Sequence, residues 1–239
     1  MAIPVPLANF DDAWTYTSEI PGWLKPGQAR MLWDAASRLE SGATIVEIGS
    51  HQGRSTVILG AAARTVGARI IAIDPFVDGH LFGGAQTRNQ FEKHIADAGL
   101  DDIVELVVGY STRLRPTWDR PFDLLYIDGK HDYWTFTDDL RWSSWLPEGG
   151  EILVHDCYSS IGVTLGVLAK VLSGRRYRYL DRSDSMARFA LGSPTGADRR
   201  RVLAELPWFG RNVLIKIGLR LWPRRAVTVL GHTGPHDPY

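Results

Sequence analysis

Apolar residues gather in five short runs along the first two thirds of the chain. Each run is rich in β-branched or aliphatic residues and is apolar on both faces, which is typical of strands buried inside a parallel sheet. The predicted strands are Thr44–Ile48, Arg69–Ile73, Ile103–Val108, Phe122–Ile127 and Glu151–Val154. Between them apolar positions recur every three or four residues, and this period predicts helices. The predicted helices are Gly27–Leu39, Ser55–Val66, Gln86–Ala98, Tyr133–Leu146 and Ile161–Leu172. Strands that alternate with helices predict an α/β domain whose parallel sheet is covered on both faces.

Two further apolar runs, Tyr177–Leu180 and Ala187–Leu191, are separated by a short polar segment and predict an antiparallel hairpin that closes the sheet.

The 239 residues suffice for one large domain, alone or with an appendage. The single cysteine, Cys157, excludes an intrachain disulfide and a zinc site built from cysteines. We therefore expect a reducing compartment, with the cytoplasm as the default. Met1–Phe10 lacks the pattern of a signal peptide, and no uncharged stretch is long enough to span a membrane, so neither export by that route nor a membrane span is expected.

Charge is spread unevenly, although the formal net charge is zero. Between Arg199 and Arg225 eight cations stand against one anion, so this part carries +7 and the remainder −7. The asymmetry indicates an anionic surface or partner for the C-terminal residues. Within them, Trp208–Trp222 is an apolar segment whose cations lie roughly on one helical face; these are Arg211, Lys216 and Arg220. Such a segment fits peripheral contact with a membrane or the face of a second subunit, and a homodimer is expected. Alternatively, it packs on its own domain and exposes a solvated basic face.

A glycine-rich stretch within Ile45–Thr56 carries the clearest sign of a ligand. A strand that ends in Gly49-x-x-x-Gly53 and runs into a helix allows backbone N–H groups to approach a ligand beside the positive end of the helix. The second strand ends at Asp74, where doubly wound folds place the acid that binds ribose hydroxyls. These features together predict a nucleotide-like ligand. In the alternative interpretation, the two glycines only form a tight turn.

Four motifs at the ends of predicted strands resemble those of a known family. They are Glu47-x-Gly49-x-x-x-Gly53, Asp74, Tyr126-Ile127-Asp128-Gly129, and Leu146-Pro147-Glu148-Gly149-Gly150 leading into Leu153-Val154-His155-Asp156. The chain resembles the class I S-adenosylmethionine-dependent methyltransferases over residues 27–192. Within that superfamily it is most similar to the metal-dependent O-methyltransferases of the macrocin and catechol type, which include enzymes that methylate sugars.

The resemblance implies a Rossmann-like seven-stranded sheet in the order 3-2-1-4-5-7-6 with helices on both faces. It also implies that S-adenosylmethionine is the cofactor and that seven residues contact it or steady its loop: Glu47, Gly49, Ser50, Gly53, Ser55, Asp74 and Ser111. We accordingly divide the chain into an N-terminal segment (1–26), a methyltransferase domain (27–192) and a basic, apolar C-terminal extension (193–239).

Acidic and imidazole groups follow the fourth and fifth predicted strands. Asp128 ends one strand and the pair His155-Asp156 ends the next, so oxygen ligands for Mg²⁺ or Mn²⁺ are expected to converge at that edge of the sheet. In the resembling enzymes an acid stands where this chain has His155, and imidazole also suits softer ions such as zinc or iron. A purely structural role for His155, hydrogen-bonded to Asp156, is the alternative.

His131 is the predicted general base. Catechol-type members carry a lysine three residues after the fourth-strand Asp, and this chain has His131 at that position. Imidazole has an ordinary pKa near neutrality, which suits the role. Lys130 is the fallback, and in the alternative interpretation His131 caps the next helix or lies at the surface.

Nine tryptophans are many for this length. Trp134 follows the predicted base closely and could stack on a sugar ring, whereas Trp142 and Trp145 are expected in the core. The loop 76–84, which contains His80, is either a lid over the acceptor or a plain surface loop.

The predicted function is metal-assisted O-methylation of a saccharide or related polyol, with no nucleic-acid partner. The strong preference for arginine over lysine is typical of genomes rich in G and C and favours an actinobacterial source. Two other function classes stay open. One is an NAD-dependent oxidoreductase, although the first glycine of its usual fingerprint is missing. The other is a membrane-surface or glycan-binding module on a degenerate methyltransferase fold.

Overall fold

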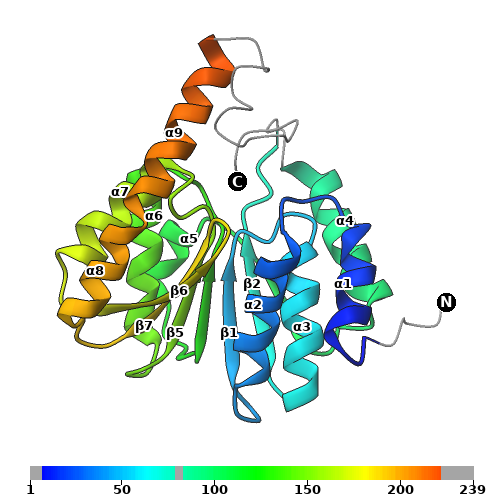
Figure 1. Ribbon diagram of the computed structural model, residues 1–239. Coiled ribbons are helices and arrows are strands. Elements are labelled where there is room, and N and C mark those ends of the chain that lie inside the picture. The colour runs from blue at the N-terminus through cyan, green and yellow to red at the C-terminus, as the bar shows by residue number, and fades with distance from the viewer. Residues whose placement is uncertain (1–6, 79–82, 222–239) are drawn as a thin grey trace.

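Seven strands form one sheet in the order β3-β2-β1-β4-β5-β7-β6 (Figure 1). The computed structural model describes residues 7–78 and 83–221. Strands β1 to β5 pair in parallel, and β7 lies antiparallel between β5 and β6. The strands are β1 Thr44–Ile48, β2 Arg69–Asp74, β3 Val104–Val108, β4 Leu124–Ile127, β5 Glu151–Val154, β6 Tyr177–Ser183 and β7 Met186–Leu191. The expected Rossmann-like order and the closing hairpin are therefore confirmed.

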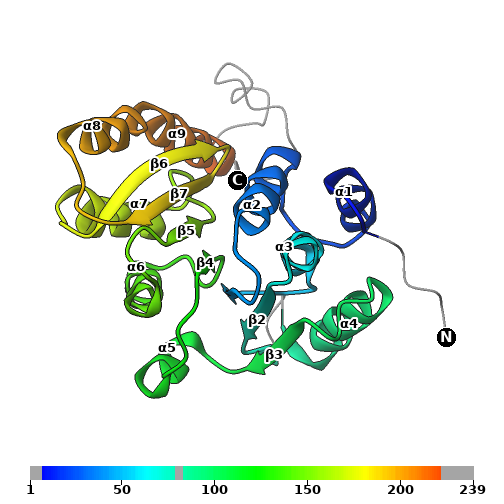
Figure 2. The same ribbon diagram turned by 90° about the horizontal axis from the view of Figure 1, so that it is seen from below.

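Helices cover both faces of this sheet, as the view from below shows (Figure 2). The described helices are α1 Phe10–Ser18, α2 Pro26–Ser37, α3 Arg54–Val66, α4 Gly84–Asp97, α5 Ser111–Leu114, α6 Tyr133–Asp139, α7 Ile161–Val167, α8 Gly196–Ala204 and α9 Leu206–Leu221. Short 3-10 turns occupy Arg115–Thr117 and Leu140–Trp145, and a π turn occupies Leu168–Leu172. No described helix is long and apolar enough to cross a membrane.

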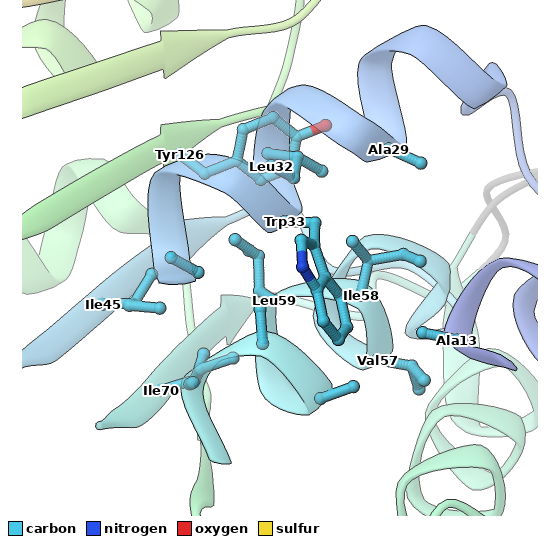
Figure 3. Close-up of a cluster of buried hydrophobic side chains, with 14 of the residues drawn as sticks. Ala13, Ala29, Leu32, Trp33, Ile45, Val57, Ile58, Leu59, Ile70 and Tyr126 are labelled. Atoms are coloured by element: carbon cyan, nitrogen blue, oxygen red, sulfur yellow. The ribbon is translucent and has the colours of Figure 1, made fainter. Parts of the chain in front are cut away.

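Two buried clusters hold the layers together, because successive side chains of a strand point to opposite faces. In β4, Leu124 and Tyr126 face the cluster built with α2 and α3, which Figure 3 shows around Trp33. Leu125 and Ile127 join the opposite cluster, which contains residues of α6 and α7. Both faces of the strands are thus apolar, as the sequence pattern predicted.

The predicted helices differ from the observed ones mainly at their ends. The helix predicted over Tyr133–Leu146 is α-helical only to Asp139, and the one predicted over Ile161–Leu172 only to Val167. Helix α1 was not predicted; Asn9 begins it by accepting a hydrogen bond from the backbone N–H of Asp12.

Candidate functional site

The loop after β1 depends on glycine for a close approach between two strand ends. Gly49 has φ of +89°, and a Cβ there would lie 2.2 Å from the carbonyl oxygen of Asp128. Gly53 also has φ of +89°, at the start of α3. Any larger residue at position 49 would push the ends of β1 and β4 apart. The two glycines therefore do form a tight turn, and this turn also brings the loop beside Asp128.

Asp74 holds this loop through backbone hydrogen bonds. Its Oδ2 accepts from the N–H groups of Ser50 and His51 at 3.0 and 2.9 Å, and its Oδ1 accepts from Phe76 at 2.8 Å. A carboxylate has about four lone-pair sites, so one remains for a ribose hydroxyl. In this structure Asp74 therefore holds the loop after β1 in place. The sequence did not indicate this structural role.

Glu47 lies fully buried in β1 behind the same loop. Its two carboxylate oxygens accept from the hydroxyls of Ser55 and Thr56, each at 2.5 Å, so it anchors the first turn of α3. Burial raises the pKa of Glu47 to about 7, although these two hydrogen bonds lower it in part. Ser55 thus acts through Glu47, and Thr56 is a partner that the sequence reasoning missed.

We predict that Glu47→Gln removes a pH-dependent loss of stability. The folded-state pKa of Glu47 is raised from 4.5 to about 7, so the stability that this group contributes is full below pH 4.5 and is lost as pH rises through 7. Relative to the wild type, the free energy of unfolding of the variant should therefore rise by up to about 3 kcal/mol between pH 4.5 and pH 8. Urea denaturation of the cofactor-free protein at several pH values measures this. Glu40→Gln, at an exposed glutamate, is the control, and an equal rise there would contradict the prediction.

Ser111 follows β3 and is paired with an acid that the sequence analysis did not single out. Its hydroxyl donates to Oδ1 of Asp139 at 2.6 Å. Burial raises the pKa of Asp139 to about 7, while the hydrogen bond from Ser111 lowers it in part. A Cβ at Gly129 would lie 3.1 Å from Oδ2 of Asp139, which places this pair beside the loop that carries Asp128. No motif marks Asp139, because only the packing of α6 against α5 brings it there.

Two aspartates and two histidines form one cluster at the carboxyl ends of β4 and β5. Nδ1 of His155 lies 3.4 Å from Oδ1 of both Asp128 and Asp156. Nδ1 of His131 lies 3.2 Å from Oδ2 of Asp156, and its Nε2 lies 3.7 Å from Oδ1 of Asp128. Tyr126 donates its hydroxyl to Oδ2 of Asp128 at 3.0 Å. The structure therefore brings together the predicted base and all three predicted metal ligands.

The imidazoles and carboxylates of this cluster shift one another's pKa. Burial alone would raise the pKa of Asp128 and Asp156, but the charges of the histidines hold both below their ordinary values. Burial lowers the pKa of His155, and the two carboxylates more than offset this and raise it well above 6.5. The two carboxylates thus favour the protonated form of His155, which lies between them. The pKa of His131 is raised in the same way, against the effect of its burial.

The expected divalent metal does not fit this arrangement. Among residues 7–78 and 83–221, no group of three His, Cys, Asp or Glu side chains is placed to hold a metal ion. The reason is local: the carboxylate oxygens that would face an ion face imidazole nitrogens instead. The three residues predicted as metal ligands contact one another instead: His155 pairs with Asp128 and with Asp156. This arrangement agrees with the alternative in which His155 is hydrogen-bonded to Asp156 and has a structural role.

His131 is the most accessible member of the cluster. Its side chain is 40% exposed, whereas that of His155 is 4% exposed. It does not cap the following helix, because Asp132 does so by accepting from the backbone N–H groups of Trp134 and Thr135. Lys130 turns away from the cluster and pairs with Asp132 at 3.0 Å. His131 is therefore the member of the cluster that is most open to the surface.

The N-terminal segment forms one wall of a pocket at this edge of the sheet. The pocket is lined by Pro21, Gly22, Trp23, Leu24, Gly49, Ser50, His51, Arg54, Ser55, Tyr126 and Asp128. Arg54 ties the wall down by donating to the carbonyl of Gly22 at 2.8 Å, and the rings of Trp23 and His51 lie 5.9 Å apart. Oγ of Ser50 is buried, and a hydrogen bond from this side chain contributes to lowering the pKa of Glu47. Arg54 directly follows Gly53 in the glycine motif. Its position was the only feature of the sequence that pointed to a contact between this loop and the N-terminal segment.

Other predicted residues lie apart from this pocket or beyond the described chain. Trp134 is 79% exposed and contacts the ring of Tyr133, while Trp142 is fully buried, as expected of a core residue. His80, and with it the middle of the predicted lid, lies outside the described residues. A larger pocket of about 660 Å³ lies between α1 and α4 and contains none of the predicted site residues.

The part of the chain that contains the glycine loop and the charged cluster is similar to known proteins. Residues 46–157, from β1 to just past β5, match the family model described as a methyltransferase domain. This segment is a little under half of the chain, and it resembles a methyltransferase domain. It includes all four members of the charged cluster, and the match agrees with the expected enzyme class.

Solved structures agree with this fold. A methyltransferase from Podospora anserina, bound to SAH, has a TM-score of 0.61 at 16% identity, with 81% of this chain and 90% of that chain covered. The O-methyltransferase TomG from Streptomyces achromogenes, in complex with SAM, has a TM-score of 0.55 at 20% identity over 80% of this chain and 91% of that chain. An O-methyltransferase from Bacillus cereus, in complex with SAH, has a TM-score of 0.57 at 17% identity over 77% and 90%. The chain thus shares its fold with these methyltransferases.

Proposed function

We propose that the protein transfers a methyl group from S-adenosylmethionine to a hydroxyl oxygen of a saccharide or related polyol. The observation that carries the proposal is the position of His131, which lies at the carboxyl edge of a methyltransferase domain between Asp128 and Asp156. The glycine loop and the pocket that contains Ser50 lie beside Asp128 at the same edge. The cofactor site and the base that we propose are therefore adjacent.

Three groups support binding of S-adenosylmethionine. The loop from Gly49 to Gly53 is fixed by Asp74, the buried hydroxyl of Ser50 lines the pocket, and Glu47 provides a carboxyl just behind the loop. When bound, the cofactor supplies a methyl group on a sulfonium sulfur, which is electrophilic. The structural neighbours that hold SAM or SAH share this fold and support the choice of cofactor.

The residues of the cluster supply the base and its orientation. As the acceptor oxygen bonds to the methyl carbon and the carbon–sulfur electron pair passes to sulfur, the hydroxyl proton must leave, and we assign it to His131. Asp156 orients the ring of His131, and the positive charge of His155 keeps both carboxylates ionised.

The saccharide class of acceptor rests on an exposed aromatic residue that follows the base closely in the sequence. Trp134 is three residues beyond His131, and its exposed ring can stack on the apolar face of a sugar. The neighbours described as O-methyltransferases support oxygen as the methylated atom.

Calorimetry and a methyl-transfer screen test this proposal. The full chain should bind S-adenosylmethionine and not NAD, and it should transfer labelled methyl groups to members of a panel of mono- and oligosaccharides. Activity should persist after exhaustive EDTA treatment, because the cluster pairs its carboxylates with imidazoles. Binding of NAD alone would favour the oxidoreductase, and activity lost with EDTA and restored by Mg²⁺ or Mn²⁺ would show that the cluster rearranges around an ion.

A further inference from the structure

Helix α9 extends from the body beyond the carboxyl ends of the strands (Figure 1). Its inner face is firmly attached: Ile215 and Asn212 are buried, and Asn212 donates to the carbonyl of Tyr158 at 3.0 Å. Tyr158 belongs to the loop that follows β5 and carries Asp156. The helix is thus fixed at the same edge of the sheet as the candidate site.

The outer face of α9 is apolar. Leu214 is 55% and Ile217 is 44% exposed, and the other outward positions, Pro207 and Gly210, are also uncharged. These positions are three or four residues apart and therefore form one stripe along the helix. Arg211 lies over the ring of Trp208, 4.9 Å from its centroid, and donates to Oδ1 of Asn212 at 3.1 Å.

The charge around this stripe has one sign. The 16 residues of α9 include three cations and no acid, and α8 adds Arg200 and Arg201, which are exposed. The nearby acid Glu205 is engaged by Arg182 at 2.9 Å and by the hydroxyl of Tyr179 at 2.7 Å. Pairing of two copies through α9 would bring cations against cations, whereas anionic lipid headgroups would complement them.

We propose that α9 docks the protein on the surface of a membrane rich in anionic lipids. The stripe around Leu214 and Ile217 enters the interface, and the cations of α8 and α9 contact the headgroups. Because Asn212 of α9 is hydrogen-bonded to the loop after β5, docking brings the candidate site close to the membrane surface. The docking itself does not depend on the proposed methyl transfer.

Vesicle sedimentation of the full chain tests this. The protein should bind vesicles of phosphatidylcholine and phosphatidylglycerol in equal parts, bind less at high salt, and not bind phosphatidylcholine alone. The double variant Leu214→Ser, Ile217→Ser should lower the partition constant roughly tenfold or more, because two partly exposed side chains lose their apolar contact with the interface. Leu165→Ser, at a residue of α7 that is 48% exposed, is the matched control and should leave partition unchanged.

Several results would overturn the proposal. They are an absence of binding to anionic vesicles, equal binding to neutral ones, or unchanged binding of the double variant. A wild-type dimer in light scattering that the double variant dissociates would assign the stripe to a second copy instead. Thermal unfolding and calorimetry with S-adenosylmethionine, both without vesicles, separate loss of docking from loss of fold or of cofactor binding.

Discussion

Replacement of His131 by alanine is expected to lower kcat by roughly a hundredfold or more while the affinity for S-adenosylmethionine stays nearly unchanged, because general-base catalysis typically contributes 10² to 10⁴. The ring of His131 lies against Asp156 at 3.2 Å and is the accessible member of the charged cluster. Loss of this ring removes the proton acceptor but leaves the glycine loop and Asp74 in place. Steady-state kinetics and calorimetry on the same preparation measure the two effects.

The pH profile distinguishes a base from a structural residue at this position. A base acts in its neutral form, and the neighbouring carboxylates raise the pKa of His131 above 6.5 despite its burial. The wild-type rate should therefore rise with pH through an inflection above 6.5, and that inflection should vanish in the variant. Lys130→Ala, one residue away and paired with Asp132, is the control and should retain near-normal kcat. Near-normal kcat in His131→Ala would move the role of base to another member of the cluster.

Replacement of Asp74 by alanine is expected to weaken S-adenosylmethionine binding by roughly 2 to 4 kcal/mol, which corresponds to a Kd about 30 to 1,000 times higher. Two causes act together. The loop N–H groups of Ser50 and His51 lose their acceptor, and the ribose hydroxyls lose a charged partner. Calorimetry gives the affinity, and thermal unfolding of the cofactor-free protein reports the loosened loop.

Two comparisons make this result specific. Asp74→Asn keeps one acceptor oxygen and should show an intermediate loss of affinity. Asp101→Ala removes an exposed acid between α4 and β3 and should change neither quantity. Unchanged affinity in Asp74→Ala would place the cofactor elsewhere on the molecule.

Local sequence patterns were sufficient for most of the framework. Runs such as Thr44–Ile48 are buried at every position and mostly apolar, and this pattern depends only on burial of both faces of a strand. The glycine at position 49 likewise follows from a local need, since its φ is positive and a Cβ would strike the backbone of Asp128. The order of the sheet, by contrast, came from the resemblance of the strand-end motifs to a family.

Helix ends were predicted less well, because they depend on caps and on contacts across the fold. The periodic pattern from Tyr133 to Leu146 does not show that the α-helix gives way to a 3-10 turn after Asp139. Helix α1 depends on a cap at Asn9 and on packing against α3, which a short pattern does not reveal.

The sequence by itself determined the alternation of strands and helices, the glycine loop and the residues that stand at the carboxyl ends of the strands. Only the tertiary structure decided how those residues pair. His155 lies between Asp128 and Asp156 because β4 and β5 are neighbours in the sheet and because Asp156 adopts φ of +57°. Such contacts join groups far apart along the chain, and their distances follow from packing and not from any local period. The same reason explains why the apolar outer stripe of α9 was visible only once its inner face was seen to be fixed to the loop after β5.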